Sequence, residues 1–125
     1  MIVGLGVDLT EVHRVREVIG RHGDRILRRV FTSGEIEYCQ RHRNSYERFA
    51  ARFAAKEAAM KALGIGWRAG IGWKEIEVLK QPSGKPELRF TGKALEKFRE
   101  LGGSRIHLSL THTDACAEAQ VIIEA

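Results

Sequence analysis

The spacing of hydrophobic residues changes along the chain and predicts where helices and strands lie. Residues 2–9 form an apolar run of strand length that includes two glycines, and we interpret it as a buried strand. Thr10 has a side chain suited to cap a helix that runs to about Ile19, whose apolar positions share one face. A second, short helix is predicted over residues 24–30.

Two residue pairs have the spacing of a capping box, in which a polar side chain and an acid three positions later close the start of a helix. Thr32 and Glu35 begin a third predicted helix. Asn44 and Glu47 begin a longer one, which ends before Gly64. The longer helix is rich in alanine, which predicts a buried and closely packed element.

The second half of the chain shows the alternation typical of short strands. Residues 74–80 and 87–90 are predicted strands joined by a tight turn, and one more helix follows them. Residues 105–111 and 115–123 are the last two predicted strands. Helices come early and hairpin-like strands late, so we predict an α+β fold in which a largely antiparallel sheet packs with helices. The length suits a single domain, 1–125.

Positive charge narrows the classes of partner. The chain has a net charge of +5 and a sequence pI of about 9.6, which favours an anionic partner, although a solvated basic surface is the alternative. Arginines gather early, at Arg14, Arg21 and Arg25 among others, without the interleaved aromatic residues of a nucleic-acid platform. We therefore expect an acidic protein partner and no nucleic acid.

Neither the apolar runs nor the cysteines indicate a location other than the cytoplasm. No apolar run approaches the ~20 residues of a membrane helix, so we expect no membrane partner. Cys39 and Cys116 are far apart and form no metal-type spacing. These features favour a cytoplasmic location.

Glu57 and Lys61 stand one helical turn apart in the alanine-rich helix and share a face. A surface salt bridge is one interpretation of the pair. A charged pair among small buried residues also suits a magnesium–phosphate site, where the carboxylate holds the cation and the lysine neutralises phosphate oxygens. Asp8, at the end of the first apolar run, is the candidate second carboxylate, with a turn-forming role as the alternative.

Polar residues near the C-terminus share one face of a predicted strand, at His107, Ser109 and Thr111. This face is either an exposed edge or the wall of a site in which His107 transfers a proton. Gly64 and Gly66 follow the alanine-rich helix and could lie against a phosphate. Their spacing matches no P-loop, and helix termination is the alternative for Gly64.

Four segments, in this order, resemble holo-(acyl-carrier-protein) synthase, the small bacterial type of phosphopantetheinyl transferase. They are GLGVDL at residues 4–9, RFAAKEA at 52–58 with Lys61 after it, Gly84-Lys85-Pro86, and HLSLTHT at 107–113. The resemblance runs nearly from end to end. It implies transfer of the 4′-phosphopantetheine arm of coenzyme A to a serine of apo-acyl carrier protein, which gives holo-acyl carrier protein and adenosine 3′,5′-bisphosphate.

The resemblance also implies residue roles. Asp8 and Glu57 match the magnesium ligands, and the implied catalytic residues are Glu57, Lys61 and His107. The positions implied at the coenzyme are Lys61, Gly64, Gly66, Ser83, Gly84, Lys85, Pro86 and His107. The positions implied at the acidic carrier protein are Arg14, Arg21 and Arg25. Small family members carry one pseudo-repeat unit per chain and form trimers with sites between subunits, so we expect a homotrimer.

Two questions stay open at the level of the sequence. The acceptor serine must lose its proton, and Glu57, His107 or a metal-bound water could take it. A different class of function, a non-catalytic basic module that binds an acidic protein or RNA, also explains the charge. That alternative leaves Asp8, Glu57 and the His107 strand without a role.

Overall fold

The computed structural model describes residues 1–65 and 70–125. Helices fill most of the first half of the chain and strands most of the second. The elements, in chain order, are β1 (Ile2–Glu11), α1 (Val12–His22), α2 (Asp24–Val30), α3 (Ser33–Gln40), α4 (Ser45–Ala62), a 3-10 helix (Trp73–Glu75), β2 (Ile76–Lys80), β3 (Pro86–Phe90), α5 (Gly92–Glu100), β4 (Arg105–His112) and β5 (Cys116–Glu124).

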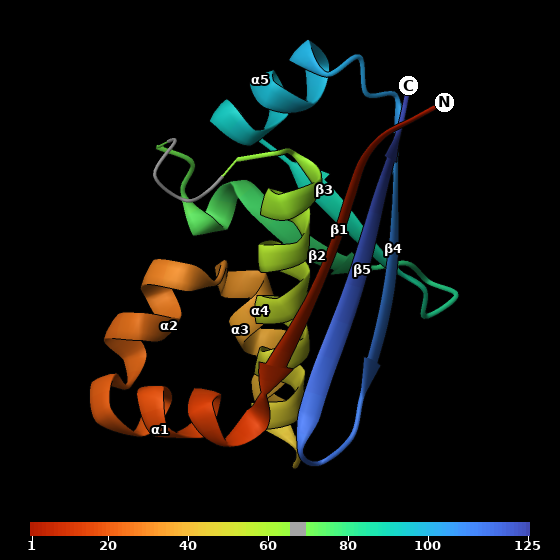
Figure 1. The fold of residues 1–125 in the computed structure, drawn as a ribbon. Helices are drawn as coiled ribbons and strands as arrows, with labels where there is room; N and C mark the ends of the chain where they lie inside the picture. The colour runs from red at the N-terminus through yellow and green to blue at the C-terminus, as the bar shows by residue number, and fades with distance from the viewer. Residues whose placement is uncertain (66–69) are drawn as a thin grey trace.

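Two antiparallel sheets organise these elements. The larger has three strands in the order β1-β5-β4, and the smaller is the β2-β3 hairpin. Helix α4 runs along one face of the larger sheet, with α1, α2 and α3 beside it and α5 near the two chain ends (Figure 1). The predicted α+β fold with antiparallel sheets packed with helices is confirmed. None of the helices in the described ranges is long and apolar enough to span a membrane.

Helix α4 packs closely because its inner side chains are small. Its buried alanines lie against the inward face of β5, where Ala119, Val121 and Ile123 are fully buried. Strand β1 comes closer still, since a Cβ on Gly6 would collide with the carbonyl oxygen of Ala58, and one on Gly4 with that of Ala62. Strand and helix backbones therefore meet at two glycines, as only glycine permits.

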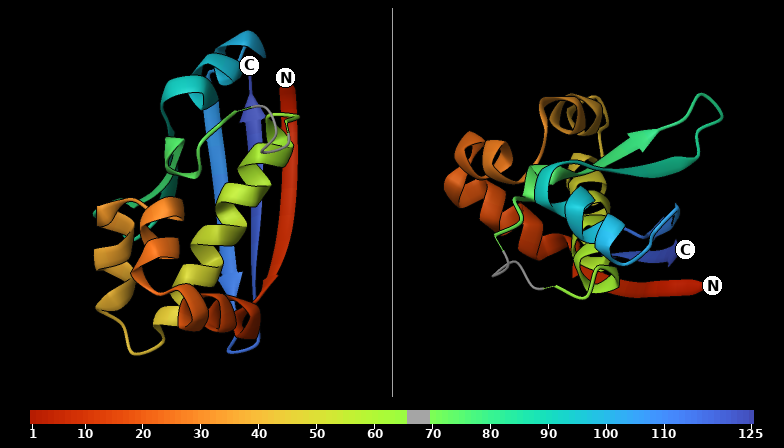
Figure 2. Two further views of the ribbon diagram at one scale, coloured as in Figure 1. Left: turned by 90° about the vertical axis from the view of Figure 1, so that its left-hand side faces the viewer. Right: turned by 90° about the horizontal axis from the view of Figure 1, so that it is seen from above.

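The larger sheet is covered on one side only, which corrects the prediction of a buried first strand. Strand β1 is an edge strand, and its outward side chains Leu5, Val7 and Leu9 are 60%, 49% and 65% exposed. Figure 2 shows α4 crossing the opposite face of the sheet. The sequence pattern misled because the inward positions of β1 include glycines, so the run looks apolar at every position except Asp8 without being buried on both faces.

Helix starts were predicted with mixed success. Thr32 and Glu35 form the expected capping box at α3. The predicted Thr10 cap is wrong, because Thr10 lies within β1 and Glu11 precedes α1. Asn44 does precede α4, but the Glu47 carboxylate turns to His112 Nδ1 at 3.0 Å instead of closing a capping box. A tertiary contact therefore engages Glu47, whereas Thr10 bonds to Asp8 within the same strand.

A buried ion pair ties α4 to the neighbouring elements. Lys56 Nζ donates to Glu35 Oε1 at 2.8 Å and to the carbonyls of Trp73 and Ile76, and both charged side chains are fully buried. Glu35 Oε2 accepts from the backbone N–H of Val78. Desolvation lowers the pKa of Lys56, while the charge of Glu35 opposes that shift. The pair holds α3, α4 and β2 in one arrangement.

The close approach of β1 and α4 predicts a strong penalty for a single methyl group. We expect Gly6→Ala to lower the free energy of unfolding by about 1–3 kcal/mol, because the strand must move off the helix backbone. Urea unfolding followed by circular dichroism measures the loss.

Gly20→Ala is the matched control for this substitution. Gly20 lies in α1, and a Cβ there would meet no heavy atom within 4 Å. Alanine should leave stability unchanged or raise it by about 0.5–1 kcal/mol, as expected in a helix interior. If Gly6→Ala unfolded at the same urea midpoint as the wild type, the close approach of β1 to α4 would be contradicted.

Candidate functional site

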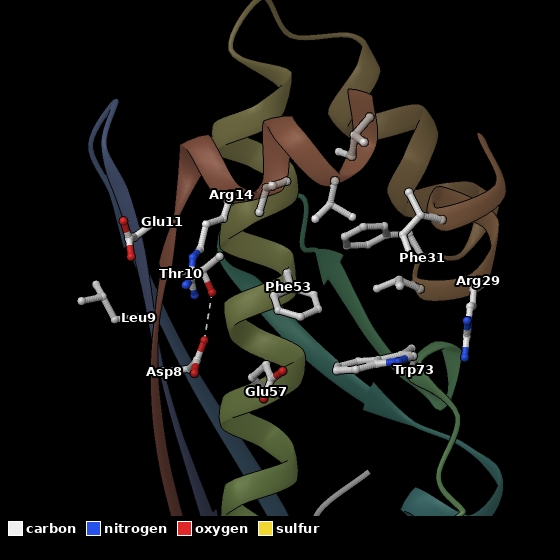
Figure 3. Close-up of a pocket in the computed structure, with 15 residues that line it drawn as sticks. Asp8, Leu9, Thr10, Glu11, Arg14, Arg29, Phe31, Phe53, Glu57 and Trp73 are labelled. Carbon is white, nitrogen blue, oxygen red and sulfur yellow. Dashed lines mark hydrogen bonds between the residues drawn. The ribbon is translucent and has the colours of Figure 1, made fainter. Parts of the chain in front are cut away.

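The structure brings Asp8 and Glu57 into one cavity. Asp8 is an inward position of β1, and Glu57 lies on the side of α4 that faces this strand. Both line a cavity of about 480 Å³ between β1, α1, α2 and α4. In Figure 3 the two carboxylates stand beside each other at one end of the cavity. Two residues 49 positions apart in the sequence thus line one cavity, which is the placement that the predicted magnesium site requires.

Asp8 is held by two neighbours. Thr10 Oγ1 donates to Asp8 Oδ2 at 2.9 Å, a contact drawn in Figure 3, and Lys61 Nζ donates to Asp8 Oδ1 at 3.3 Å. Lys61 Nζ also donates to the Val7 carbonyl oxygen at 3.0 Å. Lys61 therefore pairs with Asp8 in addition to standing one turn from Glu57.

Glu57 has an environment that disfavours its charge. Burial and then the nearby charge of Asp8 raise the pKa of the Glu57 carboxyl, while Lys61 acts in the opposite sense. A carboxylate whose ionisation is disfavoured by a second carboxylate nearby is stabilised by a cation. The predicted alternative for Glu57 and Lys61, an ordinary surface salt bridge, does not describe this pair, because the short ion pair of Lys61 is with Asp8.

The rest of the cavity wall is apolar with a basic rim. Phe53 and Trp73 lie across from the carboxylates with ring centroids 5.2 Å apart. Arg14 projects from α1 towards Thr10 and Asp8, and Arg29 lies at the far side (Figure 3). The cavity can therefore receive an anionic group near the carboxylates only together with a cation.

The donor set of this cavity fits a magnesium ion. Magnesium is bound through one or two protein carboxylates and completes its octahedral shell with water and phosphate oxygens. Asp8 and Glu57 supply that number of carboxylates. Across the described part of the chain no group of three or more His, Cys, Asp or Glu side chains is gathered for a metal.

A second cavity, of about 190 Å³, is basic. It lies between α4, the β2-β3 hairpin and β4, and Gly84 and Pro86 of the predicted turn line it. Its cationic or ionisable lining residues are Arg48, Arg52, Lys80 and His112. Sequence reasoning placed the 83–86 turn at the coenzyme but missed these partners, because Arg48 and Lys80 are separated by 32 positions and carry no motif of their own.

The pKa shifts of two groups in or near the second cavity agree with its positive charge. Burial by itself would raise the pKa of Tyr38, yet the charges of Arg52, Lys80 and Arg48 lower it. Desolvation, then Arg48 and Lys80, lower the pKa of His42. Both shifts favour the less positive form of the group, which is the effect of a local excess of positive charge.

Arg52 gives this cavity the character of a ligand site. Its side chain is 6% exposed and its guanidinium lies 3.9 Å from the centroid of the Tyr38 ring. Among the described residues its buried Nε finds no hydrogen-bond acceptor. A buried donor without an acceptor is costly, so this position favours an anion. The signal was present in the RFAAKEA segment, which includes Arg52.

The two cavities lie on opposite sides of α4. Successive helical residues are about 100° apart, so Arg52 is about 140° around the helix from Glu57, and Arg48 about 180°. The first cavity lies at the β1 edge of the three-stranded sheet and the second at its β4 edge. A single chain therefore cannot present both cavities to one small molecule from one side.

His107 is placed away from the two carboxylates. It is an outward residue of β4, opposite Ile122 of β5, whereas Asp8 faces inward on β1. His107 Nε2 pairs with Glu124 Oε1, and this hydrogen bond lowers the pKa of the Glu124 carboxyl. Within one chain His107 does not join Asp8 and Glu57, so its role there stays a prediction.

The remaining predicted positions are less informative. Gly64 has φ +73° directly after α4, so helix termination accounts for the glycine. Ser83 and Lys85 lie in the hairpin turn, where the Lys85 N–H donates to Ser83 Oγ at 3.4 Å. Arg21 and Arg25 are exposed near the α1–α2 junction. Gly66 lies outside the described residues.

Comparison with known proteins identifies the family. The family model described as the 4′-phosphopantetheinyl transferase superfamily matches residues 4–117. The chain belongs to this superfamily.

Named relatives of the transferase family match over the full length. The holo-[acyl-carrier-protein] synthase of Koribacter versatilis is 53% identical over 124 residues, which are 99% of both chains. The crystal structure of holo-[acyl-carrier-protein] synthase from Neisseria meningitidis superposes with a TM-score of 0.89 at 32% identity and covers 100% of both chains. A Bacillus anthracis holo-(acyl-carrier-protein) synthase in complex with CoA (3′,5′-ADP) gives 0.82 at 32% identity, over 100% of this chain and 98% of that one.

The raised pKa of Glu57 predicts a pH-dependent effect of its removal. The carboxyl is protonated more easily in the folded than in the unfolded chain, so its contribution to stability is present below its ordinary pKa and lost as pH rises through the raised one. Glu57→Gln should therefore be as stable as the wild type below about pH 4 and more stable at neutral pH. Urea unfolding across this range measures the difference.

Glu96→Gln provides the control, because Glu96 is an exposed residue of α5. It should show no comparable gain between acidic and neutral pH. A Glu57→Gln protein that is less stable than the wild type at neutral pH would mean that the charged carboxylate stabilises the fold, contrary to the environment described here.

Proposed function

We propose that this chain transfers 4′-phosphopantetheine from coenzyme A to a serine of apo-acyl carrier protein. The products are holo-acyl carrier protein and adenosine 3′,5′-bisphosphate. The observation that carries the proposal is the meeting of Asp8 and Glu57 in one cavity, with Lys61 bonded to Asp8, in a chain that matches holo-[acyl-carrier-protein] synthases from end to end. The whole chain, residues 1–125, is proposed to act as one transferase domain.

Asp8 and Glu57 are the residues that would hold Mg²⁺. The ion supplies neutralisation of the negative charge that develops on the pyrophosphate as its P–O bond breaks. Lys61 would place a second positive charge beside the same phosphates. Asp8 and Glu57 would fix the position of the cation, and the apolar wall at Phe53 and Trp73 would limit access of water to the site.

Glu57 is also the proposed proton acceptor in this cavity. Its carboxylate lines the cavity that the serine must enter, which is the position a general base requires. The acceptor serine would have to reach the cavity beside Glu57, and transfer of its proton would leave the oxygen free to attack phosphorus. His107 can take part only if another copy of the chain brings it there.

The basic cavity is proposed to bind the anionic nucleotide end of coenzyme A. Arg48, Arg52 and Lys80 offer positive charge, and the buried Arg52 Nε offers a donor. The hairpin turn beside this cavity is formed or adjoined by Ser83, Gly84, Lys85 and Pro86. This position supports their proposed place at the coenzyme. Phosphate groups match guanidinium donors in geometry as well as charge.

The opposite placement of the two cavities supports a site shared between copies. If the β1 edge of one copy meets the β4 edge of the next, the carboxylate cavity of one chain faces the basic cavity of its neighbour. Such a head-to-tail contact closes into a ring, and a homotrimer is the ring we propose. The exposed Leu5, Val7 and Leu9 offer an apolar contact surface for it, and the same sheet face includes His107.

The basic helices provide the proposed docking surface for the carrier protein. Arg14 lines the carboxylate cavity, and Arg21 and Arg25 continue the positive surface near the α1–α2 junction. An acidic partner steered to these arginines would arrive with its serine close to Glu57.

A direct assay tests the proposed reaction. The protein is mixed with coenzyme A, magnesium and a matched apo-acyl carrier protein, and the carrier is weighed by mass spectrometry. We expect the gain of one phosphopantetheine mass with the wild type and none with Glu57→Gln at equal time. A folded wild-type protein that adds no mass would overturn the proposal in favour of a non-catalytic basic binding module.

Mixing two inactive variants tests whether sites are shared. Glu57→Gln damages the carboxylate cavity, and Arg48→Glu with Lys80→Glu damages the basic one. Unfolding and refolding an equal mixture should restore about a quarter of the wild-type rate, because each required half is intact in one copy out of two.

A second mixture is the matched control for this experiment. Glu57→Gln and Lys61→Met both damage the carboxylate cavity, so mixing them should restore nothing. If the first mixture also stays inactive while every variant folds, each chain would have to bind coenzyme by itself and the shared site would be wrong.

A further inference from the structure

Both oxygens of the Asp8 carboxylate already have partners within the chain. Thr10 Oγ1 donates to Oδ2, and Lys61 Nζ donates to Oδ1 while it also holds the Val7 carbonyl. The side chain of Asp8 is 16% exposed and that of Lys61 is 55% exposed. A movable ammonium group therefore lies on a carboxylate that the fold keeps in place.

The Lys61 ammonium and a divalent cation would compete for the same oxygen. Magnesium requires ligand oxygens at about 2.0–2.1 Å in near-octahedral arrangement. An ammonium 3.3 Å from Oδ1 would repel that ion and occupy part of its surroundings. Thr10 is nearly buried, whereas Lys61 is a flexible side chain in the last turn of α4, so Lys61 is the partner that can leave.

We infer that Lys61 exchanges partners, neutralising Asp8 in the free protein and moving to a coenzyme phosphate when a divalent ion binds Asp8. This inference rests on the metal site proposed above and adds a function for Lys61 in the free protein. Release of Lys61 from Asp8 gives the phosphates a cation, and a phosphate that holds Lys61 leaves Asp8 open. The divalent ion and coenzyme A therefore bind cooperatively, and each raises the affinity for the other by the same factor.

Three substitutions separate this exchange from a general effect of charge. Lys61→Met removes the ammonium group but keeps the apolar stem. Because the Lys61 side chain is exposed, we expect this variant to fold. Lys61→Arg keeps the charge and the competition for Asp8. Lys97→Met removes a lysine from α5, where Nζ pairs with Glu100 at 3.8 Å, and controls for the loss of one positive charge elsewhere.

The experiment measures Mn²⁺ binding by electron paramagnetic resonance, without carrier protein and therefore without turnover. In the absence of coenzyme A, Lys61→Met should bind Mn²⁺ more tightly than the wild type, by up to about fivefold, because an exposed ion pair of this kind contributes up to about 1 kcal/mol. Lys61→Arg and Lys97→Met should stay close to the wild type. Saturating coenzyme A should tighten Mn²⁺ binding in the wild type more than in Lys61→Met.

Failure of the exchange and failure of the proposed metal site give different results. If Asp8→Asn and Glu57→Gln bind Mn²⁺ as well as the wild type, the metal assignment itself is wrong and the exchange falls with it. If those two variants bind weakly but Lys61→Met binds no more tightly than the wild type, the metal site stands and the exchange alone is overturned. Equal tightening in Lys61→Met and Lys97→Met would likewise overturn it, because general charge would explain both.

Discussion

The arrangement of the site depends on the contact between strand β1 and helix α4 at two glycines. Any side chain at Gly6 would strike the Ala58 carbonyl, and one at Gly4 would strike that of Ala62. The strand can therefore lie directly on the helix, and Asp8, two residues beyond Gly6, is brought beside Glu57. A carboxylate pair needs such a rigid support, because an ion bridging the two side chains tolerates little change in their separation.

Helix α4 presents three different environments around its axis. Glu57 lines the carboxylate cavity and Lys61 reaches Asp8 of β1, Arg52 faces the basic cavity, and Lys56 enters the interior to pair with Glu35. The adjacent charged residues Lys56 and Glu57 thus have separate roles: Lys56 stabilises the packing, and Glu57 belongs to the site. The interior pair also holds the Trp73 carbonyl, so the wall of the cavity is tied to the same helix.

A sheet with one bare face gives this small chain a way to complete its site. The helices cover the inward face, where Ala117, Ala119 and Val121 are fully buried, and leave an apolar edge strand outside. The carboxylates lie at the β1 edge of this sheet, and the arginines of the basic cavity lie at its β4 edge. Under the proposed association of copies, the apolar strand would be covered and the two halves would be joined into one site.

The sequence by itself determined the local elements and the candidate residues. Periodic apolar positions predicted the α+β fold, Thr32 and Glu35 predicted their capping box, and the motifs picked out Asp8, Glu57 and Lys61. Only the tertiary structure decided that Glu47 turns to His112 and that Arg48 and Lys80 join Arg52. The physical reason is range: helix and strand patterns arise between near neighbours, whereas a polar side chain bonds to whatever group the completed packing brings within reach.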